Sequence, residues 1–142
     1  MDGLVGLVTY NPAMVKIALG THMVTGYAED SFVVIDSISG GVTSKSGCDG
    51  ETVRSVDPNE RFSVKLSLQM GSPTHKYLLD RYKRDKKDGS GHFPVLINDL
   101  TGKEKFSASV AWVTKLPSNT KGKEGQNKEW TLETGQANFD IE

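Results

Sequence analysis

Residues 62–69 read Phe62-Ser63-Val64-Lys65-Leu66-Ser67-Leu68-Gln69. Phenylalanine, valine and leucine occupy every second position of this stretch, and serine, lysine and glutamine occupy the positions between them. Because successive side chains of a β-strand point to opposite faces, this alternation predicts a half-buried strand with one apolar and one polar face.

The same alternation returns in the segment from Lys105 to Thr114. The residues expected on its buried face are Phe106, Ala108, Val110 and Trp112. Trp112 and Trp130 each alternate in phase with aliphatic neighbours, so both are expected in the core. From their β-branched and aromatic residues, further strands are predicted at 15–19, 23–27, 32–38, 93–97, 129–133 and 137–141.

One helix is predicted after the quoted strand. Ser72 is a suitable cap and Pro73 fits the first helical position. The apolar stripe expected to pack on a sheet consists of Tyr77, Leu78, Leu79 and Tyr82. A charged run at 83–88 follows, and Gly89-Ser90-Gly91 is expected to end the helix. Between two later strands, Asp99-Leu100-Thr101-Gly102 predicts a tight turn that closes on its glycine.

Two regions, 40–60 and 117–128, are polar without an apolar period. The first is long for a connection in a small domain, and such loops are usually functional or disordered. Its alternating residues also fit the two arms of an extended hairpin with Gly47-Cys48-Asp49-Gly50 near the tip. A mobile solvated loop is the alternative.

The overall composition excludes several classes of protein. With 36% hydrophobic and 25% charged residues, the chain suits one globular domain rather than a disordered or disulfide-rich protein. The 17 basic and 18 acidic residues give a net charge of −1, which argues against a protein that grips phosphates. No apolar run has the length of a membrane span, and the start has no signal-peptide pattern. The single cysteine, Cys48, has no internal partner, so cytosol-like conditions are expected.

No pattern in the sequence indicates an enzyme, a cofactor or a metal. Ser90 and His92 lack the frame of an activated serine, and the three histidines have no zinc-ligand spacing. The acidic residues of the long loop lack the calcium-loop spacing, and no phosphate-binding glycine motif is present. We therefore expect no catalytic, cofactor-binding or metal-binding residues.

An ordered series of short motifs resembles a family of bacteriophage tail tube proteins, of the kind found in myophages. The series runs through residues 47–54, 62–73, 93–102, 111–112 and 129–137, and so spans essentially the whole chain. No single motif is diagnostic, and the order of the parts carries the specificity.

The resemblance implies a mainly β fold in which two packed antiparallel sheets, sandwich-like or barrel-like, carry one flanking helix and a long extended loop. It implies one tail tube domain over residues 1–142, assembled as hexameric rings that stack into a hollow conduit for DNA during ejection. The implied partners are other copies of the chain and the tail sheath, tape measure, baseplate and tail terminator proteins. The implied location is the virion tail after assembly in the host cytoplasm, without membrane insertion of the subunit.

Two groups of residues are expected to serve this assembly. The long loop is expected to reach neighbouring subunits through Ser44, Lys45, Ser46, Asp49, Glu51 and Arg54. DNA must slide without sticking, so slim polar side chains are expected on the lumen wall. The candidates are Ser63, Ser67, Gln69, Ser107 and Ser109. Lys65 and Lys105 share those faces, and acids such as Asp36 would have to offset them.

Three alternative functions stay open at the level of sequence. The first is the inner tube of a contractile injection device that resembles a phage tail. The second is a monomeric β-sandwich that binds carbohydrate through Trp112 or Trp130. The third is a small hydrolase that uses Ser90 and His92.

Overall fold

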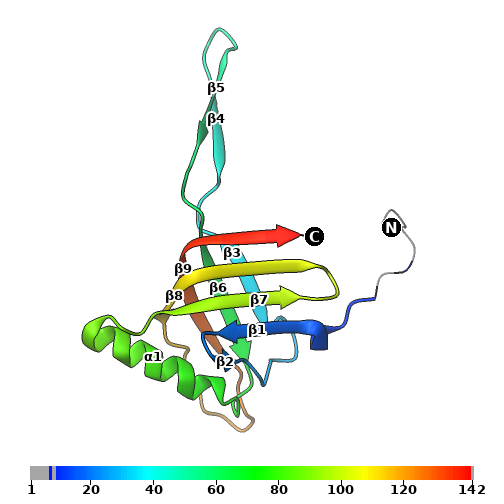
Figure 1. Cartoon of the computed structure of the whole chain (residues 1–142), viewed down its shortest axis with the longest axis vertical. Helices are drawn as coiled ribbons and strands as arrows, with labels where there is room; N and C mark the ends of the chain where they lie inside the picture. The colour runs from blue at the N-terminus through cyan, green and yellow to red at the C-terminus, as the bar shows by residue number, and fades with distance from the viewer. Residues whose placement is uncertain (1–6, 8, 142) are drawn as a thin grey trace.

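The computed structural model describes residue 7 and residues 9–141 of the chain. A short 3-10 turn, η1, precedes the first strand. One helix, α1, comes between β6 and β7 in the chain and lies beside the large sheet (Figure 1). The elements in chain order are η1 (Pro12–Met14), β1 (Val15–Leu19), β2 (His22–Met23), β3 (Val33–Ser37), β4 (Val42–Ser46), β5 (Thr52–Val56), β6 (Arg61–Leu68), α1 (Thr74–Asp88), β7 (Phe93–Asp99), β8 (Glu104–Lys115) and β9 (Lys128–Ile141).

The strands form two antiparallel sheets, which confirms the predicted mainly β fold with one helix. One sheet has seven strands in the order β2-β1-β7-β8-β9-β6-β3, and the other is the two-stranded hairpin β4-β5. The large sheet curls, so that β1 near one end and β3 at the other line the same cleft. The two layers that enclose the core are therefore the two halves of one curled sheet, which we call its limbs.

The core confirms the pattern of the quoted stretch. Val64, Leu66 and Leu68 of β6 are fully buried, whereas Lys65 between them is exposed. They pack in one cluster with apolar residues of the opposite limb, including Ile17, Leu19 and Phe106. Trp130 is also buried in this cluster, as expected, and its Nε1–H donates to Nδ1 of His75 at 2.9 Å.

The alternation predicted for β8 is wrong in its second half. Phe106 and Ala108 are buried, but the next buried residues are Ala111 and Val113. An irregularity in the β7–β8 register lies between Val95↔Ala108 and Phe93↔Ala111, and an extra residue at such a bulge reverses the faces of all later side chains. Val110 is consequently exposed, and Trp112 lies on the outer face of the sheet.

Other strand boundaries also differ from prediction. The two segments predicted at 129–133 and 137–141 form the single long strand β9. The segment predicted at 23–27 contributes only the two-residue strand β2 and an isolated bridge from Tyr27 to Leu68.

Helix α1 begins and ends where the sequence indicates. The Ser72 hydroxyl accepts from the Thr74 N–H at 3.2 Å, and Gly89 ends the helix with a left-handed φ of 78°. Leu78 is fully buried and contacts the core. Leu79, which was expected in the buried stripe, lies on the exposed side. No described helix is long and apolar enough to span a membrane.

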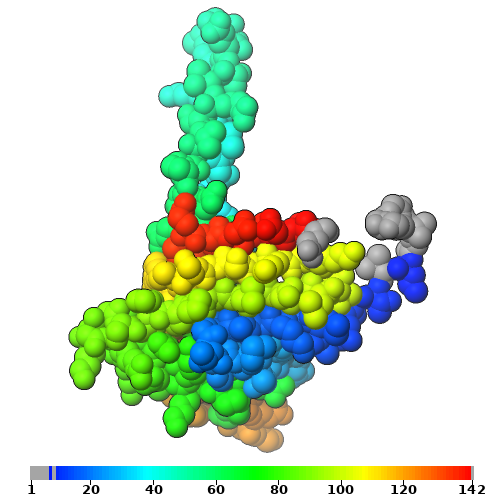
Figure 2. Space-filling view, in the orientation of Figure 1, coloured from blue at the N-terminus to red at the C-terminus, as the bar shows by residue number. Residues whose placement is uncertain are grey.

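The region 40–60 contains the predicted hairpin. Strands β4 and β5 pair from Val42↔Val56 to Ser46↔Thr52, and Gly50 in the tip has a φ of 86°. The hairpin stands away from the rest of the molecule (Figures 1 and 2). Every residue of its two strands is exposed.

Candidate functional site

All the residues predicted from the sequence to contact neighbouring subunits lie on the projecting hairpin. In the stem, Ser44 lies opposite Arg54, Lys45 opposite Val53, and Ser46 opposite Thr52. Asp49 and Glu51 form the tip, where the Asp49 carboxylate accepts from the Glu51 N–H at 3.2 Å. One protruding element therefore presents Ser44, Lys45, Ser46, Asp49, Glu51 and Arg54.

The two faces of the stem differ in composition. Directly opposed residues of an antiparallel pair share a face, and the faces alternate along each strand. One face therefore carries the valine pair Val42 and Val56 together with Ser44 and Arg54, and we call it the valine face. The other face carries Lys45 and Val53.

The stem valines have no covering layer in their own subunit. Val42, Val53 and Val56 are 51%, 67% and 71% exposed. A two-stranded hairpin is only marginally stable in water without a surface to pack on. Val42 and Val56 form an exposed apolar pair on one face, and Val53 is exposed on the other.

The base of the hairpin is fixed to the large sheet. The Glu60 N–H donates to Oε1 of Gln136 on β9 at 2.9 Å, and Nε2 of Gln136 donates to the Pro58 carbonyl at 3.3 Å. The Asp57 N–H donates to the Gly41 carbonyl at 2.7 Å and closes the two arms. These bonds hold the direction in which the stem leaves the body.

The lumen candidates do not form one patch. Ser63 lies between Asp36 and Glu133 in a cross-strand row on the outer face of β3, β6 and β9. Ser67 lies beside Glu129 on the same strands. Ser107 and Ser109 instead line a shallow hollow over β1, β7 and β8. Gln69 follows the end of β6, where its carbonyl contacts Nε2 of His75 at 2.7 Å.

Arg61 is a residue of the outer face that sequence reasoning missed. Its guanidinium lies 5.8 Å from the ring centre of Trp112 and donates to the Glu133 carboxylate at 3.0 Å. Trp112 is thus partly covered by an arginine rather than presented as an open platform, and Trp130 is 3% exposed. Trp130 therefore has no free aromatic face for carbohydrate, and Arg61 lies over the ring of the half-exposed Trp112.

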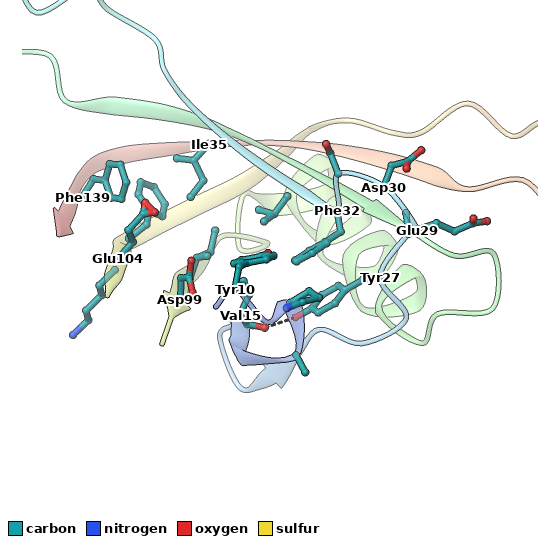
Figure 3. A pocket seen from close by; sticks show the side chains of 18 residues that line it. Tyr10, Val15, Tyr27, Glu29, Asp30, Phe32, Ile35, Asp99, Glu104 and Phe139 are labelled. Carbon is teal, nitrogen blue, oxygen red and sulfur yellow. Dashed lines mark hydrogen bonds between the residues drawn. The ribbon is translucent and has the colours of Figure 1, made fainter. Parts of the chain in front are cut away.

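A large apolar hollow was also missed. It is a cleft of about 900 Å³ between the β1 and β3 ends of the curled sheet (Figure 3). Its apolar lining includes Val15, Tyr27, Phe32, Ile35, Phe106 and Phe139. These residues are far apart in the sequence, so only the curl of the sheet brings them together.

The cleft wall is apolar and its rim is acidic. Tyr27 and Phe32 stack with ring centres 4.4 Å apart, and the Tyr27 hydroxyl donates to the Val15 carbonyl at 3.4 Å. Burial raises the pKa of the Tyr27 hydroxyl, which like any phenol is protonated at neutral pH and so can donate. The charged lining residues are Glu29, Asp30, Asp99, Glu104 and Lys105.

The residues weighed for chemistry have structural partners. The Ser90 hydroxyl donates to the exposed Asp88 carboxylate at 2.6 Å and makes no described bond with His92. His75 bridges Trp130 and Gln69, and His22 contacts the Thr74 hydroxyl at 2.9 Å. Among the residues that the structure describes, no three His, Cys, Asp or Glu side chains are grouped to hold a metal.

Solved structures with the same fold come from contractile injection systems. The tube-terminating cap of the anti-feeding prophage aligns with a TM-score of 0.65 and 12% identity over 99% of this chain and 97% of that chain. A chain of the sheath–tube complex of the PVC extracellular contractile injection system gives 0.64 and 13%, over 94% and 93% of the two chains. A chain of the PVC sheath/tube terminator gives 0.66 and 13%, over 97% and 100%. At these identities the likeness shows a shared fold.

Sequence comparison identifies the family. A curated relative, "Structural protein ORF10" of Pseudomonas phage KPP10, is 24% identical over 139 residues, covering 92% of this chain and 80% of that protein. The sequence profile described as bacteriophage PhiTE tail tube protein matches residues 17–141. Because this match spans most of the chain, the protein belongs to the bacteriophage PhiTE tail tube family, a family of phage structural proteins and not of enzymes.

Proposed function

We propose that the chain assembles into stacked hexameric rings that form the hollow tube of a phage tail and let DNA pass during ejection. Assembly would take place in the host cytoplasm, with residues 1–142 as one tube domain. Family membership supports the tube, and the observation that carries self-assembly is the exposed hairpin β4–β5. Its valines have no covering layer in their own subunit, so copies of the chain would supply one.

The two ends of the large sheet support ring closure. β3 is the last strand at one end, and the two-residue β2 leaves much of β1 open at the other. Free strand edges pair readily with other chains, and a closed ring of subunits removes them. In the proposed ring, edges of neighbouring subunits join into one continuous inner barrel.

The distribution of charge supports one arrangement of the wall. Helix α1 is rich in exposed cations: Lys76, Lys83, Arg84, Lys86 and Lys87. Cations that face DNA bind phosphates and would retard its passage. We therefore place α1 away from the lumen. The outer face of β3, β6 and β9 is the better candidate for the wall, because Asp36 and Glu133 there offset the cations Lys65 and Arg61.

Other tail components are proposed partners. The structures of similar fold include a sheath–tube complex and a sheath/tube terminator, which supports contacts of this tube with a sheath and a terminator. Contacts with a tape measure and a baseplate are inferred from tail tube architecture alone.

Removal of the hairpin tests the proposal. In the variant, residues 42–56 are replaced by Asn-Gly, which joins Gly41 to Asp57, because this dipeptide suits a two-residue hairpin turn and the Asp57 N–H already donates to the Gly41 carbonyl. We expect the natural chain to form tubes in negative-stain micrographs, whereas the variant stays monomeric in sedimentation velocity. Circular dichroism and thermal unfolding should show a folded body in both proteins. Cys48→Ser, which keeps the hairpin and removes its exposed thiol, is the control and should still polymerise. Tubes that form without the hairpin would contradict the proposal.

A contractile injection device is the second candidate, because the structures of similar fold come from such devices. Particles that contain this protein separate the two functions. A phage tail would be attached to a DNA-filled capsid in electron micrographs, whereas an injection device would have no capsid.

A further inference from the structure

We propose that the cleft between β1 and β3 is the receptor for the hairpin stem β4–β5 of a second copy of the chain. The inference rests on the proposed self-assembly and adds the surface on which the stem docks. It joins the exposed valine pair of the hairpin to a large apolar hollow.

The cleft has the chemistry of a surface for a protein segment. Its volume of about 900 Å³ is at the upper end of the range for small-molecule sites. Such sites usually aim a few free polar groups at the ligand. Here the Tyr27 hydroxyl is already bonded to the Val15 carbonyl and the Asp99 carboxylate to N–H groups of its own turn, while Glu29 and Asp30 point away from the aromatic side chains (Figure 3). An apolar floor with a charged rim matches the usual anatomy of a protein interface.

The valine face of the stem complements this surface. Val42 and Val56 lie side by side and supply aliphatic surface for the aromatic floor formed by Tyr27, Phe32 and Phe139. Arg54 on the same face supplies a cation for the rim.

The rim supplies the matching anions. The Asp99 carboxylate already accepts from the N–H groups of Thr101 and Gly102 in its own turn. Glu29, Asp30 and Glu104 take no part in the ion pairs between described residues, which are Arg61–Glu133 and Arg84–Asp80. These three carboxylates are therefore the proposed partners of Arg54.

The stem that enters the cleft comes from another copy. The hairpin points away from the body that contains the cleft, and its base is held there by the bonds to Gln136 (Figures 1 and 2). A contact between two different surfaces of identical chains is heterologous, so it continues from copy to copy instead of closing as a dimer. Such a contact suits subunits that build a tube.

A charge swap between two variants tests the pairing. Arg54→Glu places an anion on the valine face, and the double variant Glu29→Lys, Asp30→Lys places cations on the rim. We expect the critical concentration for polymerisation of each variant on its own to be about tenfold or more above that of the natural chain, because like charges then meet. Mixed in equal amounts they should copolymerise, since each reversed stem can enter a reversed rim. The control is Lys45→Glu, which makes the same charge change on the other face of the stem. Mixing this control with the rim variant should not restore polymerisation of the rim variant.

A photo-crosslinker in the cleft identifies its occupant directly. Ser31 lines the cleft and is exposed, so Ser31→Cys in a Cys48→Ser background carries a benzophenone there. In assembled tubes, we expect mass spectrometry to find crosslinks to peptides from 42–56 of another copy. The hairpin-deleted protein should give none.

Two results would overturn the inference. One is that the two charge variants are folded but do not copolymerise when mixed. The other is a cleft probe in intact tubes that captures residues 1–14 or another surface. Because the probe is read in tubes that have formed, a negative result leaves the proposed function standing. Failure of the natural chain to form tubes would count against the proposed function itself.

Discussion

Gly89 and Gly91 follow the same helix, but different constraints require them. Gly89 has a left-handed φ of 78° and open space around the position of a Cβ. A Cβ on Gly91 would lie 1.9 Å from the Arg81 carbonyl oxygen and 2.7 Å from the Asp85 backbone nitrogen. The Gly91 N–H also donates to the Asp85 carboxylate at 3.3 Å, which holds the chain against the helix.

Alanine at these two positions should therefore have unequal effects. We expect Gly89→Ala to lower the free energy of unfolding by about 1 kcal/mol, the cost of a left-handed L-residue. Gly91→Ala should lower it by about 3 kcal/mol, because backbone atoms must move to admit the methyl group. Urea unfolding followed by tryptophan fluorescence measures both, with the same slope expected for each variant. Equal effects of the two substitutions would show that the contact at Gly91 is not tight.

Local sequence indicates which residues end the helix, but not what each does. Ser72 and Gly89 act as predicted, since caps and left-handed glycines depend on neighbours in the chain. In the turn after β7, however, the left-handed residue is Lys103 with a φ of 56°, not Gly102. A Cβ on Gly102 would lie 2.8 Å from the Asp99 carboxylate, so a larger residue there would displace that side chain. Sequence shows that a glycine is present, but not which contact requires it.

At the scale of elements, strand faces were predictable where pairing is regular. The alternation of β6 is confirmed, because Val64, Leu66 and Leu68 on its inner face are fully buried and Phe62 is half-buried. The faces of β8 reverse at the bulge opposite Phe93 and Val95, so Trp112 lies outside. A bulge is set by the partner strand, and residues 105–114 alone do not encode its position.

The hairpin β4–β5 should change its protection on assembly. In the monomer its amides lack a covering layer, so we expect fast hydrogen exchange there and slow exchange in β6. In tubes, exchange at residues 42–56 should slow by about tenfold or more, because opening then requires loss of the intersubunit contact. Hydrogen–deuterium exchange mass spectrometry of both forms makes the comparison. Equal exchange in monomer and tube would show that the hairpin stays solvated.

At the scale of the whole molecule, the fold class and the family could be predicted from the sequence, and the cleft could not. Strand patterns and an ordered series of motifs run along the chain, where they are visible without a structure. The cleft joins Tyr27 and Phe32 to Phe106 and Phe139, and their proximity depends on how far the large sheet curls. The positions of the lumen candidates have the same limit, since Ser63 and Ser107 lie on strands that β9 separates.

The account depends on one physical claim, that strand edges and hairpin valines left open in the single chain are covered by further copies of it. Cryo-electron microscopy of the purified protein at high concentration tests this most directly. We predict hollow tubes of stacked six-membered rings, with β3 paired across a subunit boundary and Val42 and Val56 buried against another copy. A compact monomer that persists at high concentration, with the hairpin in solvent, would contradict the account.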